Sequence, residues 1–153
     1  MGKLELTRMI AAPPKEVFVF FVPQRMPYWY GVEMNSCFEM EDGATDFAVG
    51  RKVRISGKLG RKDVSHTAVV TGFTPGRMLE WRFRDAAGVR GTERWELEPM
   101  GAEGNGTMLR FTDQYELPGR FGPLVDWLLT RHALALRNRD YTERLAKLAE
   151  RRG

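Results

Sequence analysis

Apolar and charged residues alternate along much of the chain, as they do in β-strands with one buried face. Leu79, Trp81 and Phe83 are separated by the charged residues Glu80 and Arg82. Because successive side chains of a strand point to opposite faces, this spacing predicts a sheet with one dry face and one charged face. A second segment alternates in the same way, and its predicted dry face consists of Val53, Ile55 and Leu59.

The same pattern predicts six strands after an opening strand that ends near Met9. The six strands span roughly 32–40, 50–59, 63–73, 78–85, 89–98 and 106–117. The gaps between them contain Gly, Asn, Asp or Pro, the residues typical of tight turns. Short connections favour antiparallel neighbours, so we expect a meander.

Two regions have features of helices. The first begins at the 13–14 proline pair, which a first helical turn tolerates, and continues through 15–21 until Pro23 and Pro27 end or bend it. The second is much longer and runs from about 121 to 151 after a Pro-Gly pair.

Residues of the long helix recur at alternating spacings of four and three, which places them along one seam. The predicted seam is Leu124, Leu128, Arg131, Ala135, Asn138, Thr142, Leu145 and Ala149. The opposite face is expected in water and carries Asp126, Arg137, Asp140, Arg144, Lys147 and Arg151. A sheet with one dry face needs a cover, and this helix can supply it. The sequence therefore predicts an α+β fold, in one domain over residues 1–153.

Composition and charge exclude several classes of protein. Cys37 is the only cysteine, so an intramolecular disulfide and a cysteine metal cluster are excluded. His66 and His132 lie on different elements without a zinc-binding motif, and we expect no metal. The net charge of +4 is spread along the chain, so we expect no nucleic-acid partner. No apolar run is long enough to cross a bilayer, and a cytoplasmic protein without stable membrane insertion is expected.

Several segments, in their order along the chain, resemble one family. They are IAAP (10–13), PYW (27–29), FTPGRMLEW (73–81), GTERWELEP (91–99) and YELPG (115–119). In this respect the chain resembles the helix-grip superfamily called START, SRPBCC or Bet v 1-like, and in particular its bacterial polyketide cyclase/dehydrase-like branch. The resemblance implies a curved antiparallel sheet of about seven strands in the order β-α-α-β6-α, wrapped around the long C-terminal helix. It also implies an internal cavity for lipids, polyketides, sterols or similar molecules, with no fixed cofactor, in a monomer or homodimer.

Polar residues interrupt the surfaces that should be dry. Glu93 and Asp113 fall on apolar strand faces, and Arg131 and Asn138 lie in the middle of the helix seam. An unpaired buried charge costs several kcal/mol, so these groups should contact one another, water or a ligand. We expect Arg131 to pair with Glu93 or Asp113, with His66 able to join them, in a cluster that orients the polar atoms of a ligand.

Two simpler interpretations compete with this cluster. A β-bulge could turn one carboxylate into solvent, or a satisfied ion pair could merely close the mouth of the cavity. Large inward aromatic side chains either stack on a ligand or form ordinary core. With these alternatives open, the expected ligand-binding set is Trp29, Ile55, His66, Trp81, Phe83, Glu93, Trp95, Phe111, Asp113, Tyr115, Trp127, Leu128, Arg131 and Asn138.

Three functions are compatible with these features. The first is binding or transport of a small hydrophobic molecule in the cavity. The second is a cofactor-independent cyclase or dehydratase in which Glu93, Asp113 or His66 acts as general acid or base on an enolisable substrate. The third is a regulatory module whose outer sheet face meets another macromolecule through Arg51, Lys52 and Arg54.

Overall fold

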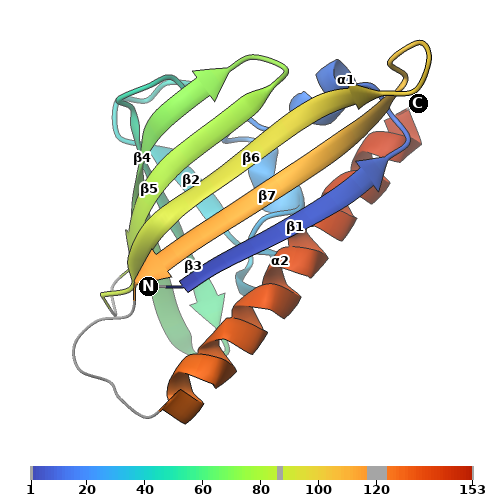
Figure 1. The fold of residues 1–153 in the computed structure, drawn as a ribbon. Helices are drawn as coiled ribbons and strands as arrows, with labels where there is room; N and C mark the ends of the chain where they lie inside the picture. The colour runs from blue at the N-terminus through green and yellow to red at the C-terminus, as the bar shows by residue number, and fades with distance from the viewer. Residues whose placement is uncertain (1, 86–87, 117–123, 153) are drawn as a thin grey trace.

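A curved antiparallel sheet and a long C-terminal helix are the two main layers of the molecule (Figure 1). The computed structural model describes residues 2–85, 88–116 and 124–152, with the side chains of the last range from residue 133 to 151. Within these ranges the seven strands are β1 (Gly2–Ile10), β2 (Cys37–Met40), β3 (Lys52–Leu59), β4 (Lys62–Thr74), β5 (Met78–Asp85), β6 (Arg90–Met100) and β7 (Gly106–Glu116). Their spatial order is β1-β7-β6-β5-β4-β3-β2, so β2 to β7 form the predicted meander and β1 pairs with the last strand.

The N-terminal helical region is shorter than predicted. Helix α1 spans Pro14–Phe18 instead of continuing to residue 21. After it, the amides of Phe20 and Phe21 bond to carbonyls only three residues earlier, so the chain tightens into turns. Two 3-10 helices follow, η1 (Met26–Tyr28) and η2 (Val32–Met34).

The predicted strand over 32–40 is wrong in its first half. Residues 32–34 form η2, and β2 begins only at Cys37. Gly31 and Asn35 on either side of η2 have φ angles of 70° and 52°, a left-handed conformation that ends strand geometry. The other five strands of the meander lie within a few residues of their predicted bounds.

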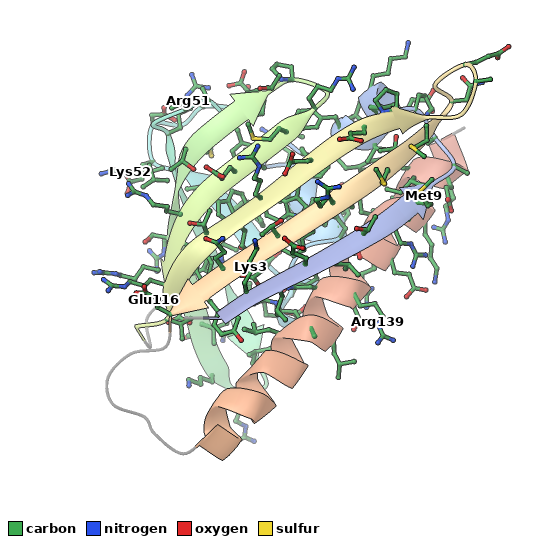
Figure 2. The ribbon with its side chains drawn as sticks, in the orientation of Figure 1. Lys3, Met9, Arg51, Lys52, Glu116 and Arg139 are labelled. Atoms are coloured by element: carbon green, nitrogen blue, oxygen red, sulfur yellow. The ribbon has the colours of Figure 1, made fainter. Side chains whose placement is uncertain are left out.

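The alternation predicted for the strands is confirmed in most positions. Val53, Ile55, Leu79 and Trp81 are buried on the inner face of the sheet. Leu59 is the exception, because it is 49% exposed at the tip of the β3–β4 hairpin, where no other element covers it. Charged residues occupy the outer face, and Figure 2 shows Lys3 and Lys52 on the side of the sheet turned away from the C-terminal helix.

The inner face is filled mainly by aromatic side chains that contact one another. The rings of Trp95 and Phe111 are stacked 4.8 Å apart, and Trp81 and Trp29 meet Trp95 edge-on at 5.0 and 5.9 Å. All four side chains are at most 1% exposed. Edge-to-face and stacked pairs at these distances add to the stability that burial provides.

Helix α2 (Leu124–Arg152) covers the inner face on the side of β1 (Figure 1). Its seam is confirmed from Asn138 onward, since Asn138, Thr142, Leu145 and Ala149 are buried. Ala135 was predicted on this seam but is exposed. The core of the molecule therefore lies between the C-terminal part of α2, α1 and the middle of the sheet.

Candidate functional site

Two carboxylates lie opposite each other on the inner face of the sheet. Glu93 in β6 is the pairing partner of Asp113 in β7, and each side chain is 1% exposed. The β6–β7 register continues without a break from Arg90 to Met100, so no bulge turns either residue outward. The bulge found in the neighbouring pairing of β4 with β5 lies after Val70, away from both acids. Directly opposed residues have Cβ atoms about 5 Å apart, close enough for two negative charges to repel each other.

Glu93 is held by two donors from different elements. The hydroxyl of Tyr30 donates to Oε1 at 2.7 Å, and the indole N–H of Trp81 donates to the same oxygen at 3.0 Å. Tyr30 follows η1, so its hydrogen bond ties the irregular N-terminal segment to β6. The other carboxylate oxygen, Oε2, has no hydrogen-bond partner among the residues that the structure describes.

Asp113 is bound from the helix. The side-chain amide of Asn138 donates to Oδ2 at 3.0 Å, while Oδ1 has no hydrogen-bond partner in the described part of the chain. Burial, and next the negative charge of Glu93, raise the pKa of Asp113 from 3.8 to about 7, although Arg137 and Asn138 oppose the shift. Asp113 can therefore change its charge near neutral pH.

The cation of the cluster is Arg137, which the sequence pattern had assigned to the water-exposed face of α2. That assignment is wrong, because Nη2 of Arg137 lies 3.4 Å from Asp113 Oδ2 and 3.6 Å from Glu93 Oε2. Its guanidinium also lies 5.3 Å from the centre of the Tyr141 ring. The flexible side chain bends from the flank of the helix toward the buried carboxylates. Arg131, predicted for this role, lies outside the described side chains.

A pocket of about 120 Å³ lies between the sheet and α2 around this cluster. It is lined by Tyr30, His66, Phe83, Asp85, Val89, Glu93, Asp113, Tyr115, Leu134 and Arg137. Five of these residues were predicted for the site: His66, Phe83, Glu93, Asp113 and Tyr115. The spacing of Leu134, Arg137 and Tyr141, by three and then four residues, was the available signal for the helix flank that faces the pocket.

Six other predicted residues are described by the structure and are not among the residues that line this pocket. Trp29, Ile55, Trp81, Trp95 and Phe111 lie in the packed core, and Asn138 contacts the pocket through Asp113. The side chains of Trp127 and Leu128, like that of Arg131, are outside the described residues.

Two further polar groups border the pocket. Burial, followed by the positive charge of Arg137, lowers the pKa of His66 from 6.5 to about 4, so its imidazole is neutral at pH 7, although Asp85 acts in the opposite direction. The hydroxyl of Tyr115 is buried without a hydrogen-bond partner among the described residues. The Tyr115 ring lies across Gly2 of β1, where a Cβ atom would collide with it. A larger residue at position 2 would therefore displace this ring.

The cations proposed for the outer face are not equivalent. Arg51 forms ion pairs with Asp42 and Asp46, whereas Lys52 and Arg54 are exposed on the outer face of β3. In the described part of the chain, no helix combines the length and apolar character needed to cross a membrane.

Comparison with known proteins identifies the family. The model of the family described as polyketide cyclase / dehydrase and lipid transport matches residues 1–151. The chain belongs to this family. No curated protein sequence matches it significantly.

Solved structures of similar fold share little sequence with this member of the polyketide cyclase / dehydrase and lipid transport family. Protein CV1439 from Chromobacterium violaceum has a TM-score of 0.73 and 16% identity, with 98% of this chain and 99% of that chain covered. Ara h 8.0201 has a TM-score of 0.72 and 12% identity, with 97% of each chain covered. DynU16, a protein of the dynemicin biosynthetic locus, has a TM-score of 0.68 and 22% identity, but this chain covers only 47% of it. The fold is thus the Bet v 1-like helix-grip fold.

Proposed function

We propose that the chain binds a small molecule, largely apolar with a polar end, in the pocket between the sheet and α2. One observation carries the proposal: buried polar atoms without partners border an otherwise apolar and aromatic pocket. Glu93 Oε2, Asp113 Oδ1 and the Tyr115 hydroxyl are all in this position within the described structure. Leaving a buried polar group without a partner costs about 1–3 kcal/mol, so a ligand that supplies partners gains binding energy. Family membership supports the proposal, since the family description includes lipid transport.

The size of the pocket limits what it can enclose. An apolar cavity of about 150 Å³ is large enough for benzene. The pocket of about 120 Å³ therefore suits one ring, or the end of a longer molecule. Phe83, Val89 and Leu134 supply the apolar walls.

A larger side chain that fills the pocket should abolish ligand binding. Leu134→Trp places an indole in the pocket, whereas Leu136→Trp changes a side chain that is 44% exposed on the same helix. We expect toluene and benzyl alcohol to bind saturably to the wild type and to Leu136→Trp, but not to Leu134→Trp, in calorimetric titrations. Native mass spectrometry of the purified protein, with organic extraction, would identify any ligand that co-purifies. If neither probe binds the wild type and no molecule co-purifies, the proposal is wrong.

A second candidate function is a cyclase or dehydratase reaction with Asp113 as general base. The raised pKa of Asp113, about 7, favours it, because a base works best when its pKa lies near the working pH. Asp113 would remove a proton from the carbon next to a substrate carbonyl, the C–H electron pair would form an enolate, and Arg137 would stabilise the enolate oxygen. In a cyclisation, the enolate carbon would attack a second carbonyl of the substrate, forming a C–C bond, and the new alkoxide would take the proton from Asp113. In a dehydration, the enolate would re-form its carbonyl and a C=C bond as the β-hydroxyl leaves, and the proton from Asp113 would convert the leaving hydroxide to water. His66 is a weaker base, because its pKa is lowered to about 4.

Conservative substitutions separate the two functions. If the chain is an enzyme, Asp113→Asn should abolish turnover of an enolisable polyketide-type substrate while binding of that substrate persists. Glu93→Gln tests the other acid in the same way. Unchanged turnover in both variants would refute the assignment of Asp113 or Glu93 as the general base.

A further inference from the structure

Among the side chains that the structure describes, more carboxylates than cations line the pocket. This inference rests on the proposed binding function and concerns the class of ligand. Three carboxylates, those of Glu93, Asp113 and Asp85, border the pocket, and Arg137 is the only cationic side chain among its described lining residues. His66 does not balance the difference, because its lowered pKa keeps it neutral at pH 7.

Arg137 satisfies the two inner carboxylates only in part, since its Nη2 donates one long hydrogen bond to Asp113 Oδ2 and none to Glu93 Oε2. Its distances of 3.4 and 3.6 Å are longer than the 2.7–2.9 Å typical of a charge-assisted hydrogen bond. Glu93 Oε2 and Asp113 Oδ1 remain without hydrogen-bond donors in the described part of the chain, although both side chains are 1% exposed. Among the described lining residues, the carboxylates outnumber the cations, and two carboxylate oxygens have no hydrogen-bond donor.

Aromatic rings surround the same space. Tyr30, Phe83 and Tyr115 line the pocket together with the His66 imidazole. The faces of tyrosine and phenylalanine rings attract cations, and groups of such rings bind organic ammonium ions in other proteins. A metal ion is a poorer fit, because no cluster of three or more His, Cys, Asp or Glu side chains suited to a metal occurs among the described residues.

We infer that the pocket selects a small organic cation: an ammonium group on a body of about one ring, which donates N–H bonds to Asp113 Oδ1 and Glu93 Oε2 while its apolar part contacts Phe83 and Leu134. A neutral alcohol of the same shape has a single donor and no charge. A carboxylate of the same shape is repelled by the acids, and among the described lining residues only Arg137 can attract it. Charge thus distinguishes three ligands that have almost equal apolar surface.

Calorimetric titration of the wild-type protein at pH 8 with benzylamine, benzyl alcohol, benzoate and toluene tests the inference. We expect benzylamine, which is protonated at this pH, to bind about tenfold or more tightly than benzyl alcohol, because it adds charge-assisted hydrogen bonds and a cation–ring contact. Benzoate should bind more weakly than toluene. The comparison uses one folded protein, so it does not depend on the stability of any variant.

Two matched variants test whether Asp113 causes the preference for benzylamine over benzyl alcohol. Asp113→Asn should reduce the preference for benzylamine over benzyl alcohol to about threefold or less, since it removes one charge and one acceptor at the site. Asp140→Asn removes the same charge from an exposed position of α2 and should leave the preference unchanged. Equal or tighter binding of benzyl alcohol or benzoate by the wild type would overturn the inference while the binding function stands. Failure of all four probes to bind, together with the absence of any co-purifying molecule, would overturn both.

Discussion

The charge of one buried acid, Glu93, helps to raise the pKa of the other, Asp113. Neither acid is exposed, and they face each other across a strand pair with one shared arginine. Glu93 receives two hydrogen bonds from neutral donors, while Asp113 receives one from Asn138. Burial and the neighbouring charge of Glu93 raise the pKa of Asp113 more than Arg137 and Asn138 lower it, so Asp113 keeps its proton up to about pH 7.

The raised pKa of Asp113 predicts that this residue lowers stability as the pH rises. The folded protein holds the proton up to about pH 7, whereas the unfolded chain releases it near pH 3.8. Between these values the folded state binds more protons, so the free energy of unfolding falls with pH. Asp113→Asn removes this pH-dependent loss. The free energy of unfolding of the variant minus that of the wild type should therefore increase by about 2–3 kcal/mol from pH 5 to pH 8.

Urea unfolding of both proteins at the two pH values measures this gain. His66, whose lowered pKa makes stability rise between about pH 4 and pH 6.5, affects both proteins and cancels in the difference. Asp140→Asn serves as the exposed control. A difference between Asp113→Asn and wild type that does not change with pH would contradict the assignment.

Arg137 is predicted to stabilise the fold by neutralising this acid pair. Arg137→Met keeps much of the aliphatic chain but removes the only cation that pairs with the two buried carboxylates among the described residues. We expect it to lower the free energy of unfolding by about 2–3 kcal/mol at pH 8, which is below the usual cost for a fully buried pair because the side chain is 31% exposed. At pH 5 the loss should be smaller, since Asp113 is then protonated. Arg144→Met, on an exposed position of the same helix, should change stability by less than about 0.5 kcal/mol, and an equal effect of the two substitutions would count against the prediction.

The sequence could predict that Glu93 and Asp113 point inward. The predicted buried seam of the C-terminal helix could not identify Arg137 as the cation that pairs with them. Glu93 and Asp113 follow from the period of two in β6 and β7, because a strand leaves little freedom in the direction of a side chain. A long arginine side chain on a helix can reach far from the position of its Cα atom. Arg137 was therefore assigned to water although its guanidinium contacts the buried acids. The role of Tyr30 depends on an irregular segment whose path no periodicity predicts.

At the level of elements, alternation and turn residues were sufficient for the hairpins and insufficient for the segment before β2. Strands β3 to β7 are joined by short turns whose Gly and Asn residues mark each reversal. Residues 32–34 were predicted as part of a strand, yet they form η2, which packs against β3. Propensity is a weak guide where packing against a neighbouring element decides the conformation.

The contact between η2 and β3 makes Gly57 a sensitive position. A Cβ atom at Gly57 would collide with the backbone carbonyl of Met34, which cannot move without shifting η2. Gly57→Ala should therefore lower the free energy of unfolding by about 1–3 kcal/mol, as expected for overpacking. Lys58→Ala, at an exposed neighbouring position, provides the comparison in chemical unfolding experiments. A stabilising effect of Gly57→Ala would mean that η2 adjusts freely and does not pack tightly on β3.

At the level of the whole molecule, the two faces of the sheet carry excess charge of opposite sign. Among the described residues, the pocket on the inner face is lined by more carboxylates than cations, and part of the outer face carries cations that form no ion pair. The exposed residues Lys52, Arg54, Arg82 and Arg84 have no ion-pair partner in the described part of the chain. The near-even total of 24 basic and 20 acidic residues hides this separation.

The four outer cations should make stability depend on salt. The pairing register places Arg54 and Arg84 on either side of Thr67, and Lys52 and Arg82 on either side of Val69. Cations two strands apart are about 10 Å from each other, where each pair repels by about 0.4 kcal/mol in water and is screened near physiological ionic strength. Raising the salt concentration from about 10 to about 150 mM should therefore increase the free energy of unfolding by roughly 0.5–1 kcal/mol.

Charge removal identifies the source of that salt effect. Arg84→Gln should weaken the dependence of stability on salt, because Arg84 repels both Arg54 across the sheet and the nearby Arg82. Arg139→Gln removes a charge from the exposed surface of α2, outside this patch, and should preserve the dependence. Thermal unfolding across a series of NaCl concentrations measures both slopes. Equal slopes in Arg84→Gln and the wild type would show that Arg84 does not repel its cationic neighbours measurably.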